Sequence, residues 1–107
     1  MTLPASIIEI DEFAFSYLKI APEASLQIGN SSNYSYWNPT NSKFSSTDNI
    51  PNLFWQNADR MIKTIMIYSK LWDASSTFTI RNKEFSVEDC FKGAHYNASF
   101  SIVKEVV

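Results

Sequence analysis

The chain has 107 residues, of which 45% are hydrophobic and 15% aromatic, and its formal net charge is −2. This length corresponds to one domain, and this composition supplies a core and excludes disorder of the whole chain. Nine basic residues are scattered among eleven acidic ones. Because nucleic-acid binding usually needs a concentrated basic stripe, no nucleic-acid partner is expected. We predict a single globular domain over residues 1–107.

The cellular compartment is inferred from what the sequence lacks. The first ten residues have no basic region of the kind that opens a secretory signal, and Glu9 and Asp11 interrupt their apolar run. No window approaches the roughly 20 apolar residues that span a bilayer. Cys90 is the only cysteine, which excludes an intrachain disulfide and a cysteine zinc cluster. These features predict a cytoplasmic protein without a membrane partner.

The first predicted element is a helix that begins near Ser6 and ends before Pro22. Ser6 and Glu9 match the capping box, in which the two side chains satisfy free amides at a helix start. Apolar residues then recur at helical spacing, at Ile7, Ile10, Phe13, Ala14, Tyr17, Leu18 and Ala21. The alternating aromatic residues over 13–17 also suit a strand. The pattern favours the helix, and the choice between helix and strand for residues 7–20 stays open.

Residues 25–28 and 34–37 are predicted to form short strands about a turn at Gly29 and Asn30. The stretch from Gly29 to Asn52 holds six asparagines and six serines, which favour loops. It also holds aromatic residues, and that combination is typical of protein-recognition surfaces. The alternative is that the aromatic side chains fold back onto the core. The predicted partner-binding residues are Tyr34, Tyr36, Trp37, Asn33, Asn38 and Phe44.

A long helix is predicted from Pro51 to about Trp72. Its apolar face carries Phe54, Trp55, Ala58, Met61, Ile62, Ile65 and Trp72. We expect Ile62 and Ile65 to be almost fully buried. Ile67 and Leu71 lie four residues apart on the opposite side of this helix. They form a second apolar strip, which is a candidate for self-association.

The C-terminal part is predicted to contain a hairpin, a short helix and a strand. The hairpin pairs residues 77–80 with 84–87 and turns Phe78, Ile80, Phe85 and Val87 inward. A short helix follows to about Gly93, and residues 97–106 form the last strand. The order of elements predicts an α+β fold, with a mainly antiparallel sheet packed under one long helix and two shorter helices.

Few residues in the sequence suit catalysis or metal binding. Cys90 and His95 are the one candidate nucleophile–base pair, but nothing in the sequence supplies the group that would orient them. One histidine and one cysteine give little basis for a metal site, and two glycines give no phosphate-binding loop. The sequence therefore predicts no catalytic residues, no metal and no cofactor.

The functional hypothesis is a small protein-binding module. Its most concrete form is an inhibitor or immunity-type protein that sequesters a partner such as a toxin. A first alternative is a structural or assembly subunit that acts through self-association. A second alternative is a small enzyme without a recognisable motif. A stable one-to-one complex with another protein favours the first hypothesis, and self-association alone favours the assembly subunit.

Overall fold

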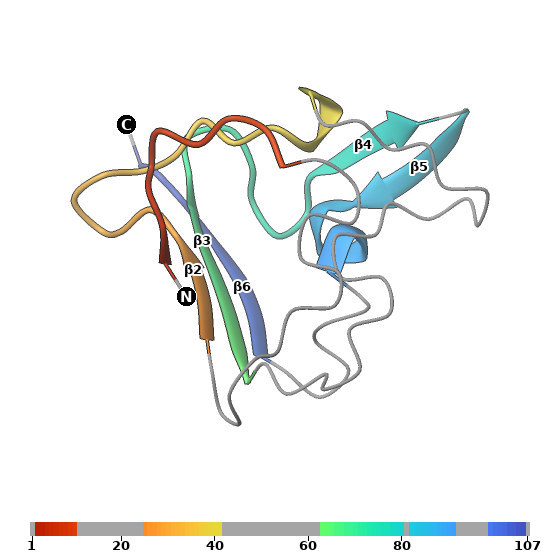
Figure 1. Ribbon diagram of the computed structural model, residues 1–107. Coiled ribbons are helices and arrows are strands. Elements are labelled where there is room, and N and C mark those ends of the chain that lie inside the picture. Colours follow the sequence, from red (N-terminus) through yellow and green to blue (C-terminus); the bar gives the residue numbers. More distant parts are fainter. Residues whose placement is uncertain (1, 11–24, 42–62, 81, 92–98, 107) are drawn as a thin grey trace.

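The computed structural model describes residues 2–10, 25–41, 63–80, 82–91 and 99–106. Within these ranges the chain forms strands and short 3₁₀ helices (Figure 1). The strands are β1 (Thr2–Leu3), β2 (Ser25–Ile28), β3 (Thr64–Ser69), β4 (Thr77–Ile80), β5 (Lys83–Ser86) and β6 (Ser99–Lys104). The 3₁₀ helices are η1 (Pro39–Asn41) and η2 (Val87–Phe91). In the described residues no helix is long and apolar enough to cross a bilayer.

Four of the strands form a parallel sheet in the order β1-β2-β3-β6, and β4 and β5 form a separate antiparallel hairpin. Along the chain, each new strand of the large sheet lies next to the previous one, and the sheet grows toward the same edge each time. Since connections between parallel strands are almost always right-handed, a strand order of this kind favours connections on one face of the sheet. In Figure 1 the hairpin and η2 lie together on one side of the sheet, in agreement with this rule.

The alternation of side chains along the strands matches a sheet that is covered on one face. In β3, Ile65 and Ile67 are buried, whereas Met66 and Tyr68 are half-buried. The strand register places Phe100 of β6 beside Ile65, on the same face. Successive side chains of a strand point to opposite faces, and a parallel strand covered on both faces reads as a continuous apolar run. We call the face with Ile65 the covered face and the other the open face.

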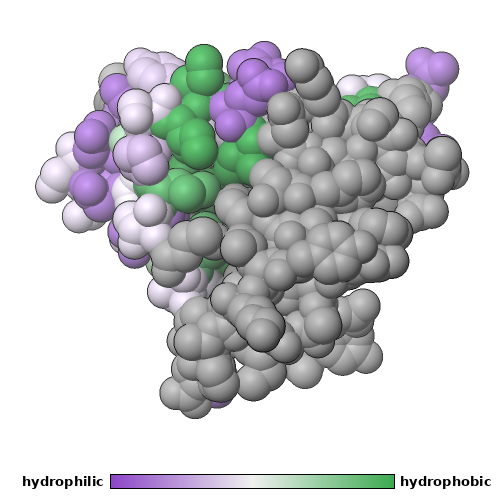
Figure 2. Space-filling model, viewed as in Figure 1, coloured by the Kyte–Doolittle hydropathy of each residue, from purple (hydrophilic) through white to green (hydrophobic). Residues whose placement is uncertain are grey.

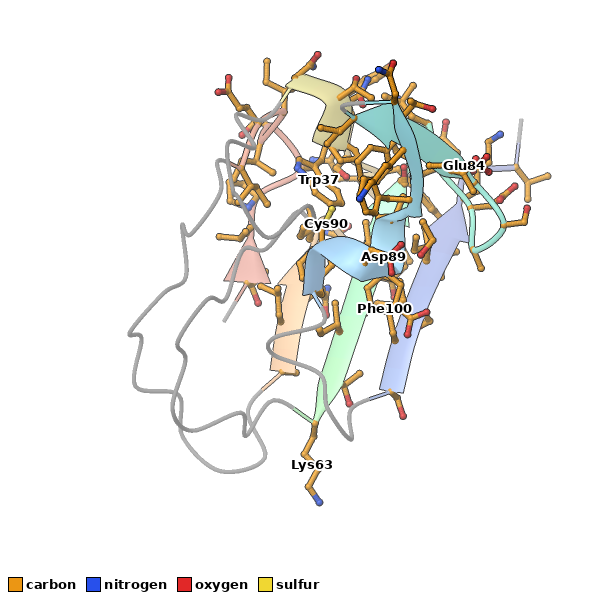
Figure 3. All side chains as sticks on the ribbon, turned by 90° about the vertical axis from the view of Figure 1, so that its right-hand side faces the viewer. Trp37, Lys63, Glu84, Asp89, Cys90 and Phe100 are labelled. Carbon is orange, nitrogen blue, oxygen red and sulfur yellow. The ribbon has the colours of Figure 1, made fainter. Side chains whose placement is uncertain are left out.

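The core lies on the covered face and draws residues from all three connections. Ile10 precedes β2, Trp37 lies between β2 and β3, and Phe78 lies between β3 and β6. The rings of Trp37 and Phe91 meet edge to face, with centroids 5.6 Å apart. Figure 3 shows Trp37 and Cys90 together in front of the sheet. The buried hydrophobic residues are Ile10, Leu26, Ile28, Trp37, Ile65, Ile67, Phe78, Val87, Cys90 and Phe91.

The segment that follows β1 leaves part of its apolar surface exposed. Figure 2 shows hydrophobic residues gathered over this segment on the viewer's side of the molecule. The side chain of Ile8 is 55% exposed, while Leu3 and Ile7 are half-buried against the core. The amide of Asn38 donates a 3.3 Å hydrogen bond to the carbonyl of Ile8, which ties this segment to the chain after β2.

The predicted α+β class, with a long helix over a mainly antiparallel sheet, is wrong. Residues 64–69 form β3 instead of the end of a helix, and the large sheet is parallel. The part of the predicted long helix before Lys63, which includes Ile62, lies outside the described residues. β-branched and aromatic residues favour strands, and pairing with β2 and β6 overrides the helical spacing seen in the sequence. Ile65 is nonetheless buried, as predicted.

The structure also differs from two further helix predictions. The first predicted helix falls mostly on residues 11–24, outside the described part, and residues 7–10 are not helical. A helical turn does follow β5, but it is the 3₁₀ helix η2 and not an α-helix.

Several local predictions are confirmed. Residues 25–28 form β2, and β6 lies within the strand predicted for residues 97–106. The hairpin pairs Phe78 with Phe85 and turns at Asn82, whose φ is 64°. Phe78 and Val87 are buried, as the alternation predicts. The hairpin depends on contacts between residues that are close in the sequence, and β2 and β6 are marked by strand-forming residue types, so the local pattern was sufficient to find them.

Candidate protein-binding surface

A tight turn after β2 brings the chain back beside β3. Asn30 and Asn33 exchange backbone hydrogen bonds of 3.1 and 3.0 Å across this turn. Gly29 precedes it with a φ of 70°, and a Cβ on Gly29 would lie 2.7 Å from the carbonyl oxygen of Asn33. A glycine is therefore required here, both for the left-handed backbone and for the close approach of the turn.

Ser35 fixes the returning chain to the end of β3. Its amide and its Oγ both donate to the carbonyl of Tyr68, at 2.8 and 2.7 Å, and its own carbonyl accepts from the amide of Lys70 at 2.7 Å. Ser35 is fully buried, and Trp37 is 1% exposed. Tyr36 lies between these two buried residues, and its side chain is 54% exposed. The backbone of Tyr36 is thus held in place while its ring faces solvent.

The carboxyl ends of three adjacent segments place Tyr36, Lys70 and Glu105 in one row. Ser35 is bridged to Ser69, and Ser69 pairs with Lys104, so the residues that follow each of these lie side by side. The Nζ of Lys70 lies 4.9 Å from the centroid of the Tyr36 ring and 4.0 Å from Oε1 of Glu105.

The neighbouring row toward the interior of the sheet holds Tyr34, Tyr68 and Val103 and carries more aromatic surface. Tyr68 pairs in register with Val103, and the ring of Tyr34 packs edge-on against that of Tyr68 with centroids 5.5 Å apart. All of these side chains belong to the open face at the carboxyl end of the sheet. We call this surface the tyrosine patch, and its residues are Tyr34, Tyr36, Tyr68, Lys70, Val103 and Glu105.

The chemistry of the tyrosine patch suits contact with a protein surface. Tyrosine combines a large apolar ring with a hydroxyl that donates and accepts hydrogen bonds. Lys70 and Glu105 are each about one-third exposed, and their 4.0 Å separation makes a weak ion pair that orients Lys70 more than it stabilises the fold. A lysine ammonium near a tyrosine ring also limits the freedom of both side chains. The patch therefore offers a pre-ordered aromatic surface with one charge of each sign.

The predicted partner-binding residues occupy different environments. Tyr34 and Tyr36 belong to the tyrosine patch, and Asn33 is exposed in the adjacent turn. Asn38 is half-buried, and its Oδ1 accepts from the amide and hydroxyl of Thr40 at 3.0 and 2.7 Å, so its side chain serves the local turn. Phe44 lies outside the described residues.

Trp37 differs most from the expectation of an exposed aromatic anchor. Its side chain is buried in the core against Phe91. Its indole Nε1 is buried and has no hydrogen-bond partner among the residues that the structure describes. The position of Trp37 therefore corresponds to the alternative weighed for this segment, in which an aromatic side chain folds back onto the core.

Ile67 and Leu71 do not form one apolar strip. Ile67 is 1% exposed on the covered face, whereas Leu71, two residues beyond the end of β3, is 41% exposed. The expected strip assumed the four-residue spacing of a helix, and the strand places Ile67 in the core instead. Because the sequence interpretation placed residues 64–69 in a helix, it did not assign Tyr68 and Lys70 to the binding surface. The β-branched and aromatic residue types within residues 64–69 are the signal that favours a strand, and a short apolar run of this kind also fits a helix.

The described residues do not form a recognisable reactive centre. Cys90 is fully buried, and burial, followed by the negative charge of Asp89, raises the pKa of its thiol above the ordinary value. His95, the expected base, lies outside the described residues. No group of three metal-binding side chains occurs within the ranges that the structure describes. The tyrosine patch is therefore the feature on which a functional argument can be built.

The comparisons with known proteins identify no relative. No family model matches the chain, and neither a curated protein nor a solved structure does. The geometry of the tyrosine patch therefore carries the functional argument.

Proposed function

We propose that this chain is a protein-binding module that contacts its partner mainly through the tyrosine patch. The observation that carries the proposal is the placement of Tyr36. Its ring is 54% exposed, although the residues on either side of it are buried. Hydrogen bonds from Ser35 to Tyr68 and from Lys70 to Ser35 hold the backbone in that position.

This arrangement lowers the entropic cost of binding. When a partner binds a mobile aromatic side chain, that side chain and its backbone become ordered, and the entropic cost of this ordering lowers the affinity. Tyr36 has a fixed backbone, a side chain with two rotatable angles, and Lys70 beside its ring. Interface energy concentrates in a few tyrosine, tryptophan and arginine residues. Tyr36 is therefore the residue of the patch from which we expect the largest contribution.

The proposal is limited to protein binding. The more specific inhibitor or immunity role has no support from the comparisons, and no described feature favours it. The α+β architecture assumed with it is replaced by a parallel sheet with a separate hairpin.

The partner can be captured through the tyrosine patch itself. A photoreactive phenylalanine analogue placed at Tyr36 should crosslink one main protein in an extract of the source organism. The matched control carries the same analogue at Glu84, an exposed residue of the β4–β5 hairpin (Figure 3). We expect a protein that crosslinks from position 36 and not from position 84. Equal capture from both positions, or capture from position 84 alone, would remove the support for this surface.

The affinity of the purified partner then measures the contribution of Tyr36. We expect Tyr36→Ala to weaken binding by about 2 kcal/mol or more, which is roughly 30-fold in Kd. Glu84→Ala should leave Kd unchanged, and thermal unfolding of both variants should match that of the parent chain because both side chains are exposed. An unchanged Kd for Tyr36→Ala would refute the proposed role of the patch.

A further inference from the structure

β6 lies at an edge of the parallel sheet. It pairs with β3 on one side, and within the described residues no strand pairs with its other side. Figure 3 shows β6 as the outermost strand of the sheet, on the side away from β1. With six residues, β6 equals β3 as the longest strand described. An edge of this length presents backbone groups that another strand can pair with.

The register identifies which backbone groups face outward. The amide of Ser99 donates to the carbonyl of Lys63, and that of Glu105 donates to the carbonyl of Ser69, both at 2.8 Å. Because neighbouring residues of a strand direct their amides and carbonyls to opposite sides, the odd-numbered residues of β6 face β3. The amides and carbonyls of Ile102 and Lys104 then point away from the sheet.

The β6 edge lacks the usual features that prevent strand pairing. Natural edge strands are often very short, interrupted by proline or a bulge, or lined with charges. The opposite edge, β1, is protected by its length of two residues. β6 contains no proline, pairs with β3 in continuous register and carries one charged residue, Lys104, at its end. Among the described strands, the long edge of β6 is thus the one open to pairing.

We propose that β6 pairs with β6 of a second copy of this chain, antiparallel and centred on Ile102. This pairing joins two four-stranded sheets into one sheet of eight strands. It uses the outer backbone edge of β6, whereas the tyrosine patch uses side chains at the carboxyl end of the open face; Val103 of β6 belongs to both surfaces.

The side chains of β6 are compatible with this self-pairing. Centring on Ile102 brings the two Ile102 side chains together and places Lys104 opposite Phe100 of the second copy. On the open face, Ser101 lies opposite Val103 of the second copy. No like charges are directly opposed. A shift of the centre to Lys104 would oppose two lysines, which destabilises a strand pair.

The charge of Lys104 also acts on a carboxylate of its own chain, that of Asp73. The pKa of Asp73 is lowered mainly by hydrogen bonds from Ser75 and Ser76, and the positive charge of Lys104 lowers it further. Lys104 can therefore lie at the dimer edge with a carboxylate of the same chain nearby. With a formal charge of −2 per chain, two copies repel each other only weakly.

The first test is the oligomeric state in solution. A single strand pair buries little surface, so we expect a monomer–dimer equilibrium between about 10 μM and 1 mM by sedimentation equilibrium. Ile102→Pro removes an outward amide that the sheet itself does not use, and it should give a folded monomer. Ile102→Val keeps that amide and a β-branched side chain, and it should still dimerise. A parent chain that remains monomeric at 1 mM would overturn the proposal, as would a dimer unaffected by Ile102→Pro.

A second test remains informative even if Ile102→Pro fails to fold. Mixing the Ser101→Cys and Val103→Cys variants under oxidising conditions should produce a disulfide-linked heterodimer, because these positions face each other at the short non-hydrogen-bonded spacing. Val103→Cys alone should form little crosslinked dimer. Absence of the heterodimer, or efficient crosslinking of Val103→Cys alone, would rule out pairing centred on Ile102.

Discussion

Cys90 illustrates how its surroundings decide the chemistry of a residue. It lies in η2, its exposure is 0%, and it belongs to the hydrophobic core on the covered face. Burial disfavours the charged thiolate, and the carboxylate of Asp89 disfavours it further, so the pKa of the thiol is raised. A nucleophilic cysteine requires the opposite environment, with a positive charge and access to solvent. Cys90 therefore behaves as a small buried hydrophobic residue.

This environment makes the reactivity of Cys90 predictable. At pH 8 the native protein should not react with a thiol reagent during the time in which the urea-unfolded chain reacts completely. Cys90→Ala should remove the signal and leave partner affinity unchanged. Rapid reaction of the native thiol would show that Cys90 is accessible, and loss of binding in a folded Cys90→Ala variant would show that it has a functional role.

Trp37 and Tyr36 are neighbours in the sequence but have opposite roles in the structure. Trp37 is in the core although its indole Nε1 has no hydrogen-bond partner among the described residues. An unpaired buried N–H costs about 1–3 kcal/mol, and burial of a large aromatic ring offsets that cost. Tyr36 points the other way because adjacent residues of an extended chain alternate in direction. Only one of the two can therefore serve as a surface anchor.

At the scale of the element, β3 determines the arrangement of the sheet. It pairs with β2 on one side and with β6 on the other, over six residues in the latter case. A helix would place Ile65 and Ile67 about 200° apart around its axis, whereas a strand places them on the same face. The burial of both residues agrees with the strand.

Substitutions along β3 test this facing directly. Ile65→Ala and Ile67→Ala should each lower the free energy of unfolding by roughly 2–5 kcal/mol, because each removes buried side chain from the core. Met66→Ala should cost less, because Met66 is half-buried on the open face. Urea denaturation of the three variants measures the differences. A small effect of Ile67→Ala together with a large effect of Met66→Ala would show that Met66, and not Ile67, points into the core.

At the scale of the whole molecule, the described elements that pack against the sheet lie on one of its faces. The covered face holds the core, and the open face carries half-buried residues such as Gln27, Met66 and Ser101, which share one row. The hydroxyl of Ser101 donates to the sulfur of Met66 at 3.3 Å across this row. The tyrosine patch lies at the carboxyl end of the same face. Binding by the patch therefore leaves the core undisturbed.

The topology also predicts the rate of folding. In the parallel sheet Leu26 pairs with Ile65, and Ile65 with Phe100, so every partner of β3 is distant in the sequence. Closing such loops before any contact is gained slows folding. We expect refolding on the order of milliseconds to seconds, followed by tryptophan fluorescence after dilution from urea. Refolding within microseconds, as in small helical proteins, would contradict this topology.

The sequence by itself determined the local elements and part of the candidate surface. The strand at 25–28 and the hairpin with its turn at Asn82 follow from alternation and turn residues, and the composition of its segment named Tyr36 as a surface residue. The inward facing of Ile65 also followed, because helix and strand both bury it. These features depend on neighbours within a few residues, and the local pattern contains that information.

Only the tertiary structure decided the class of residues 64–69 and the full composition of the tyrosine patch. A short apolar run fits both helix and strand, and its choice depends on pairing with β2 and β6, which lie 39 and 35 residues away in register. The same pairing brings Lys70 beside Tyr36 and Glu105 beside Lys70. It also sends Trp37 inward and Tyr36 outward, because Ser35 must hydrogen-bond to the end of β3. No local pattern encodes these contacts, since each joins segments that meet only when the sheet forms.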